Sequence, residues 1–150
     1  MIIKYFELKK KKLNENKFFL LYGNNKGLID ETIQETLKPI LPKNIFAYEE
    51  AEILKNIENF KENLINKSFF ENEKLIIIKR ATDKFFKVIE EVIRENIDEL
   101  SIILIADNLD KRSKIRSFFE KETNTVCIPF YEDNNQTLSL LAQRIMRDKN

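Results

Sequence analysis

The sequence predicts an α/β domain built on a doubly wound, parallel five-stranded sheet that is flanked by helices. Two observations lead to this prediction. Five short segments are apolar on both faces, which is typical of strands that are covered from both sides. Most of these segments precede a stretch with apolar residues at helical spacing, and this alternation is the pattern of a parallel sheet. The five segments are residues 17–22, 44–48, 74–79, 101–106 and 123–128.

Length and composition agree with one compact domain. The chain has 150 residues, of which 43% are hydrophobic and 34% charged, so it can form a core with a charged surface. Its unbroken apolar runs are far shorter than the roughly 20 residues that a membrane span needs, which excludes the transmembrane class, and the composition excludes fibrous and collagenous proteins. The net charge is +1 and is balanced in both halves, so a broad electrostatic affinity for nucleic acid is not predicted. No signal sequence opens the chain, and a cytoplasmic location is expected.

The first two elements can be placed from local signals. Residues 2–13 are expected to form a small hairpin or edge strand, with the lysines of residues 9–12 at its solvated tip. The strand over residues 17–22 ends at Gly23, where a helical pattern begins that continues to Pro42.

The three later strands are each bounded by similar signals. Asp107 and Asp110 follow the fourth strand and are expected to be turn and N-cap residues of a helix that begins near Lys111. The fifth strand is expected to stop at Pro129. The helix after the second strand is indicated by Ile53, Leu54, Ile57 and Phe60, and the helix after the third by Phe85, Phe86, Ile89, Val92 and Ile93. The helix after the fourth strand is indicated by Ile115, Phe118 and Phe119.

The sequence predicts one domain over residues 1–135. Residues 132–136 look like a hinge, and residues 136–150 are expected to begin a further helix, because apolar residues of 137–149 fall along one side of it.

Catalytic and metal-binding residues are not predicted. A phosphate loop of the type GxxxxGK[ST] needs a lysine for the phosphates and a hydroxyl for magnesium. Residues 23–27 supply two glycines, but Leu28 and Ile29 stand at the two functional positions and Lys26 precedes the second glycine. A strand-to-helix turn is therefore favoured over a nucleotide site, and no cofactor is expected.

Other reactive groups are equally sparse. Lys79 and Arg80 follow the third strand, where a nucleotide hydrolase would have an acidic residue for magnesium. The chain has no histidine, so Ser113 has no histidine that could act as its general base. Cys127 is the single cysteine, so it cannot form a disulfide within the chain or a zinc site of several cysteines. The sequence thus predicts no catalytic residues and no metal site.

One segment without an obvious structural role is the aromatic pair Phe69 and Phe70, which is flanked by polar residues in an expected loop before the third strand. Adjacent side chains diverge by about 100° on a helix and point oppositely on a strand, so both cannot easily face one core. The chain has three other Phe–Phe pairs, all inside long periodic elements. The pair is thus either packed at the edge of the core or exposed as a binding wedge.

Taken in order, these segments resemble a known family. The chain is similar to the N-terminal domain of the bacterial DNA polymerase III delta subunit. The similarity lies in the broken phosphate loop after Tyr22, the Ser-Phe-Phe segment at residues 68–70, the strand and basic pair at 74–80, the segment 104–114 and the late segment 126–130. That family belongs to the clamp-loader group of AAA+ proteins.

The resemblance implies an AAA+-like fold that does not hydrolyse ATP, in a subunit that binds and helps to open the sliding clamp (the beta subunit) during DNA replication. By position, Phe69 and Phe70 would be the clamp-binding residues; the family often has leucine at the first of these places. The implied partners are the clamp and the other clamp-loader subunits of the DNA polymerase III holoenzyme, a DNA-directed DNA polymerase, with primed DNA contacted only indirectly. Residues 136–150 would lead into an absent lid domain, and the fragment is expected to be monomeric.

Two other classes remain as alternatives. A divergent P-loop enzyme, such as a kinase or nucleotidase, would use Gly23 and Gly27 to bind a nucleotide. A receiver-like signalling domain has the same alternation of strands and helices, but the acidic cluster that such a domain needs is missing.

Overall fold

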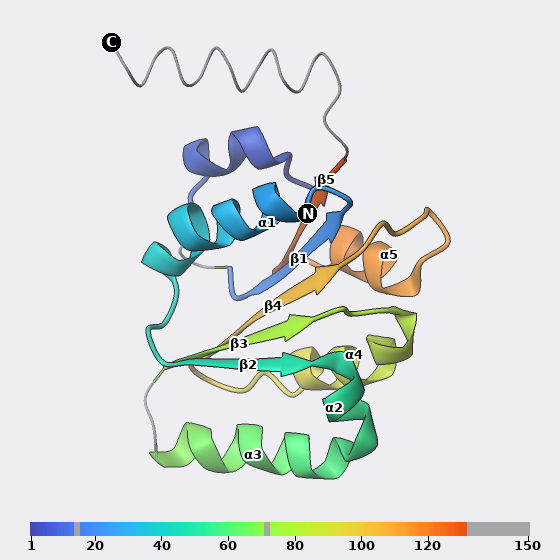
Figure 1. The fold of residues 1–150 in the computed structure, drawn as a ribbon. Helices are drawn as coiled ribbons and strands as arrows, with labels where there is room; N and C mark the ends of the chain where they lie inside the picture. Colours follow the sequence, from blue (N-terminus) through green and yellow to red (C-terminus); the bar gives the residue numbers. More distant parts are fainter. Residues whose placement is uncertain (14–15, 71–72, 132–150) are drawn as a thin grey trace.

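The predicted sheet is confirmed by the computed structural model, which describes residues 1–13, 16–70 and 73–131, with residues 66–70 described by their backbone alone. Five parallel strands lie in the order β2-β3-β4-β1-β5 (Figure 1). The first strand in sequence is therefore the fourth across the sheet. The strands are β1 (Phe18–Gly23), β2 (Ile45–Glu49), β3 (Lys74–Lys79), β4 (Leu100–Ala106) and β5 (Thr125–Phe130).

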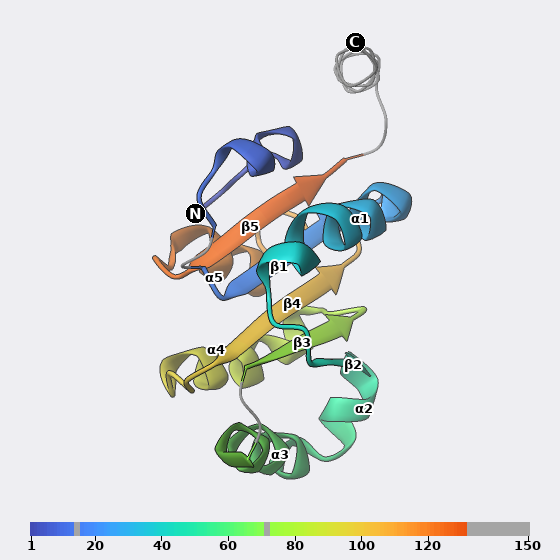
Figure 2. The same cartoon turned by 90° about the vertical axis from the view of Figure 1, so that its left-hand side faces the viewer.

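Helices connect successive strands and cover both faces of the sheet, as a doubly wound fold requires (Figures 1 and 2). The α-helices are α1 (Lys26–Thr32), α2 (Glu50–Lys55), α3 (Ile57–Phe70), α4 (Phe86–Arg94) and α5 (Lys114–Lys121). Shorter turns of 3-10 or π type are η1 (Tyr5–Lys10), η2 (Ile33–Leu37), η3 (Lys38–Ile40) and η4 (Asp83–Phe85).

The sheet separates two hydrophobic cores. On β1, Phe18, Leu20 and Tyr22 contribute to the core under α2, α3, α4 and α5, whereas Phe19 and Leu21 contribute to the core under α1 and η1. All five side chains are at most 5% exposed. A strand buried on both faces reads as a continuous apolar run, which is why the strands could be located from the sequence.

Strand β5 continues through Pro129, so the expectation that it stops there is wrong. β5 is an edge strand that pairs with β1 alone among the strands. On its outer side, the Cys127 amide donates to Met1 O and its carbonyl accepts from Ile3 N. Residues two apart point the same way along a strand, so the nitrogen of Pro129 also faces outward. A proline there removes no hydrogen bond to β1.

The expected N-terminal hairpin is also wrong. Ile2 forms an isolated parallel bridge with Cys127, and the chain then turns into η1, which buries Leu8. The Met1 ammonium donates to backbone carbonyls at the end of α5, including Phe119 O at 3.1 Å. Helix C-terminal carbonyls lack partners inside the helix and attract cations, so this contact holds the N-terminal segment against α5 and β5.

The single helix expected after β2 is two helices. The break lies at Asn56 (φ −152°, ψ 78°), whose side chain accepts a hydrogen bond from Asn59 N and begins α3. α3 then continues to Phe70, so the backbone of Phe69 and Phe70 is helical, and the expectation of a loop there is wrong. The side chains of both phenylalanines and the expected helix over residues 136–150 lie outside the described residues.

Candidate functional site

Ligands of open α/β sheets bind at the carboxyl ends of the strands, and here the turn from β1 into α1 stands at that edge. Gly23 has φ +139°, and a Cβ at this position would lie 1.7 Å from Phe130 O on β5. The glycine is therefore required by the close approach of two strands. Asn25 caps α1 by accepting a hydrogen bond from Leu28 N at 3.2 Å, which satisfies an amide that a phosphate loop would direct at its ligand.

The two residues at the lysine and hydroxyl positions of a phosphate loop face the protein interior. Ile29 is 1% exposed in the core beneath α1, and Leu28 packs against the same core. Neither side chain has a polar atom, so neither can bind a phosphate or a magnesium ion.

Ion pairs cross the cleft at this edge of the sheet. The cleft has a volume of about 290 Å³ and is lined by charged residues of both signs. Lys26 Nζ lies 3.4 Å from Asp107 Oδ1, and Arg80 Nε lies 3.6 Å from Glu49 Oε2. These contacts pair two of the cations that a nucleotide would need, so the cleft lacks the surplus of positive charge typical of a triphosphate site.

The amides at the N-terminus of α5 donate to a carboxylate of the same chain, that of Asp83. Ser113, and not Asp110, is the N-cap: its Oγ accepts from Arg116 N and donates to Asp83 Oδ1 at 2.7 Å. Asp110 instead accepts from Arg112 N in the preceding turn.

Neither member of the Ser113–Asp83 pair is suited to catalysis. Burial by itself raises the pKa of Asp83, but hydrogen bonds from Ser113 and from the Ile115 and Lys114 amides outweigh it and lower the pKa. A carboxylate with a lowered pKa is a weak proton acceptor, so it does not activate Ser113. Burial also raises the pKa of the Cys127 thiol to about 12, which leaves it unreactive at neutral pH.

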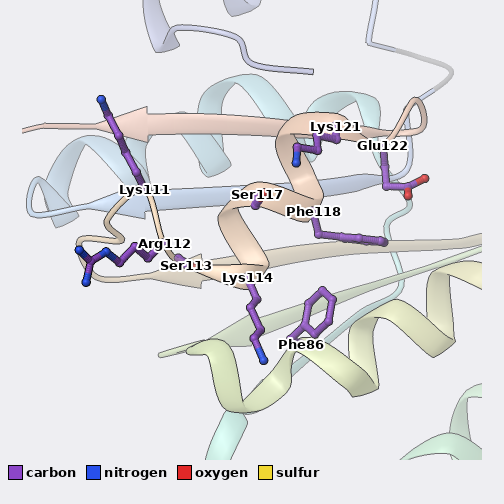
Figure 3. A pocket seen from close by; sticks show the side chains of 9 residues that line it. All are labelled: Phe86, Lys111, Arg112, Ser113, Lys114, Ser117, Phe118, Lys121 and Glu122. Atoms are coloured by element: carbon purple, nitrogen blue, oxygen red, sulfur yellow. The ribbon is translucent and has the colours of Figure 1, made fainter.

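A second hollow of about 410 Å³ lies between α4 and α5 (Figure 3). Four cationic side chains line it, two from the preceding loop and two from α5, and none of them forms an ion pair with the described residues. Figure 3 shows that these side chains point in different directions, so they do not converge on one anion. The four residues are Lys111, Arg112, Lys114 and Lys121.

This basic surface was not predicted from the sequence. Three of its four cations lie within residues 111–114, but the longest lysine run of the chain, at residues 9–12, lies elsewhere. The surface can attract an anionic partner, but it contains no reacting group. The described residues also contain no cluster of metal-ligating side chains, and none of the described helices is long and apolar enough to cross a membrane.

The predicted clamp-binding pair belongs to α3, which lies toward the β2 edge of the sheet (Figure 1). Phe60 and Leu64 are 5% and 3% exposed and mark the side of α3 that packs on the sheet. Ile65, the next residue, is 53% exposed. The backbone places Phe69 and Phe70 in the last turn of this helix.

Residues 19–129 match the family model described as DNA polymerase III, delta subunit. The matched range extends from β1 to β5 and includes the sheet, except for Phe18 and Phe130 at its two ends, and all the α-helices described above. No curated protein matches the chain.

Proposed function

Because this chain belongs to the DNA polymerase III delta subunit family, a family of DNA replication, we propose that it binds the sliding clamp and helps to open it. The contact is made by an apolar wedge, which is the pair Phe69 and Phe70. The observation that carries this assignment is the course of α3, whose helical backbone continues past the buried Leu64 and the exposed Ile65 as far as Phe70.

Helix geometry supports an outward-facing wedge. An α-helix turns by about 100° per residue, so position 69 lies about 140° around the axis from position 64, and position 70 about 120° from it on the other side. Leu64 packs on the sheet, at 3% exposed. Measured from Phe60, the other buried residue, position 69 lies about 180° around the axis and position 70 about 80°. Position 69 therefore faces away from the core, and position 70 lies at the flank of the buried side.

The energy available from the wedge is appropriate to a partner contact. Full burial of one phenylalanine side chain is worth about 1.5–3 kcal/mol, and a micromolar dissociation constant corresponds to about 8 kcal/mol. Two anchors thus supply a large part of such an affinity. If the clamp with an opened interface binds the wedge more tightly than the closed clamp does, binding shifts the equilibrium toward the open clamp by that difference in affinity. Clamp opening then needs no chemical step in this domain.

We expect no ATP hydrolysis in this domain because of the residues in the β1–α1 turn. Ile29 is buried, and Lys26 is paired with Asp107. In the complete assembly, nucleotide bound to other clamp-loader subunits would control access to the wedge, and primed DNA would be contacted indirectly. The alternative of a P-loop enzyme finds no support in the cleft.

The test exchanges both wedge residues for alanine. The Phe69→Ala/Phe70→Ala variant should keep its melting temperature, since exposed substitutions change stability by less than about 0.5 kcal/mol. It should lose clamp binding by at least about 2 kcal/mol per anchor, the size of an interface hot spot. Calorimetry or surface plasmon resonance with the clamp of the same source measures the second effect.

Matched controls come from phenylalanines in the core. Phe85 is 1% exposed and Phe118 is 9% exposed. Phe85→Ala and Phe118→Ala should each cost about 3–5 kcal/mol of stability. The wedge assignment is wrong if the double variant unfolds as readily as these controls, or if it binds the clamp as the wild type does.

A further inference from the structure

A buried lysine lies next to the wedge-bearing helix. Lys74, the first residue of β3, is 0% exposed and is among the largest fully buried side chains. Its Nζ donates a hydrogen bond to the carbonyl oxygen of Leu64 in α3 at 3.2 Å. Burial of an ammonium group is costly unless it is paired or hydrogen-bonded, so a fully buried lysine at a strand start calls for a specific reason.

The contact joins a fixed element to the helix that carries the wedge. Lys74 is held in the sheet by its own amide, which donates to Glu99 O at 2.9 Å, and by its register with Leu100 on β4. Leu64 lies six residues before the end of α3. The hydrogen bond therefore closes a ten-residue segment, and Phe69 and Phe70 lie within that segment.

Lysine is almost never fully buried in a folded protein unless it is paired. A buried charge can often be replaced by an apolar side chain of similar volume without loss of stability. Leu64 is also within a helix, where its carbonyl has a partner from the helical pattern of hydrogen bonds. The hydrogen bond from Lys74 Nζ instead ties the middle of α3 to the start of β3, and the last six residues of the helix continue from that tied point.

We propose that Lys74 is a positioning residue for the wedge, and that the hydrogen bond from its buried Nζ to Leu64 O holds the C-terminal half of α3 against the sheet. This inference rests on the proposed function. Phe69 and Phe70 are then ordered before the clamp arrives, so the clamp does not have to supply the entropy of ordering them. The lysine contributes to affinity without touching the partner.

The substitution Lys74→Met tests this directly. It keeps a long, flexible chain that fills the site and removes the charge and the hydrogen bond. We expect an unchanged or raised melting temperature, at least tenfold faster amide hydrogen exchange over residues 65–70, and a dissociation constant for the clamp at least fivefold higher. Lys55→Met, at an exposed lysine in the last turn of α2, should change none of the three.

Rescue separates positioning from a general structural role. Asn63→Ala raises the helix propensity of α3, and in the Lys74→Met background it should restore slow exchange and most of the clamp affinity. If Lys74→Met does not fold, the wild-type chain decides: amides of residues 66–70 must exchange as slowly as those of the first half of α3. Fast exchange there would overturn the proposal.

The two proposals fail in different ways. If Phe69→Ala/Phe70→Ala still binds the clamp, the wedge is wrong, while the exchange measurement on Lys74→Met stands by itself because it needs no clamp. If the double variant loses the clamp but Lys74→Met matches the wild type in both exchange and affinity, the role of Lys74 alone is wrong.

Discussion

The two glycines of the chain have different structural roles, although both belong to the same turn. Gly23 is at φ +139° with Phe130 O in the space that a side chain would fill, whereas a methyl group added at Gly27 would meet no neighbouring atom within 4 Å. Gly27 also lies inside α1, where glycine is a poor helix former. Backbone geometry, not phosphate binding, accounts for the first glycine.

Two substitutions of identical composition should therefore have opposite effects. Gly23→Ala should destabilise the domain by more than about 3 kcal/mol, because strand β5 must shift to admit the methyl group. Gly27→Ala should stabilise it by about 0.5–1 kcal/mol. Chemical denaturation of the two variants measures both, and a comparable loss in each would contradict the geometry of the turn.

The carboxylate of Asp83 gives the domain a dependence on pH. Its pKa is lowered in the folded state, so its contribution to stability is present above the unfolded value of about 3.9 and is lost as the pH falls through the folded value. Asp83→Asn should cost about 1 kcal/mol at pH 7, a small value because the side chain is exposed to solvent screening.

The difference in stability between the wild type and Asp83→Asn should become smaller as the pH falls below about 4. Melting temperatures measured from pH 7 to pH 3 follow this change. Asp98→Asn, at another exposed aspartate, serves as the control, and its melting temperature should change with pH as that of the wild type does. A gap of constant size across this range would show that Asp83 does not act through its charge.

Among the elements, the strands were predicted within two residues at each boundary. Four of them are buried on both faces, which gives continuous apolar runs, whereas the edge strand β2 has no fully buried residue and a weaker pattern. The extension of α3 was not, because residues 61–68 carry no regular apolar pattern and this part of the helix depends on tertiary contacts such as Lys74 with Leu64. The cap at Ser113 was missed because its partner Asp83 is distant in sequence.

The candidate site was predicted to a different degree. The broken phosphate loop could be recognised from Leu28 and Ile29 alone, since the missing groups are side chains at fixed positions. The ion pairs across the cleft could not, because each brings together residues from separate elements. The basic surface beside α5 was not predicted either, although its four cations lie within residues 111–121. The wedge at Phe69 and Phe70 stays a prediction.

The turn between β1 and α1 should be inactive toward nucleotides. We expect no binding of Mg-ATP with a dissociation constant below about 100 µM, which corresponds to about 5 kcal/mol, and no hydrolysis. Isothermal titration calorimetry checks the first and phosphate release checks the second. Tighter binding would revive the alternative of a P-loop enzyme.

At the scale of the whole molecule, one sheet joins two cores that do not otherwise meet. Leu20 and Leu21 are neighbours on β1, both 0% exposed, and they face opposite cores. Because the sheet is shared, loss of packing on either face should be transmitted to the other. The domain is therefore expected to unfold as one unit.

Leu20→Ala and Leu21→Ala test this unity with the same change on opposite faces. Each should cost about 2–5 kcal/mol, and each should leave a single unfolding transition whose dependence on urea is that of the wild type. Coincident fluorescence and circular dichroism curves would confirm it. Two separate transitions in either variant would show that the cores unfold independently.

The strand order also determines when the domain can be completed during its synthesis. β1 is translated first among the strands, yet both of its neighbours, β4 and β5, are translated last. A nascent chain that has exposed β1, β2 and β3 can pair only β2 with β3, and β1 then remains an apolar strand without a partner. Pairing between distant segments is slow, and unpaired strands promote aggregation. We therefore expect newly made chains to depend on the ribosome surface or on chaperones until β5 has emerged.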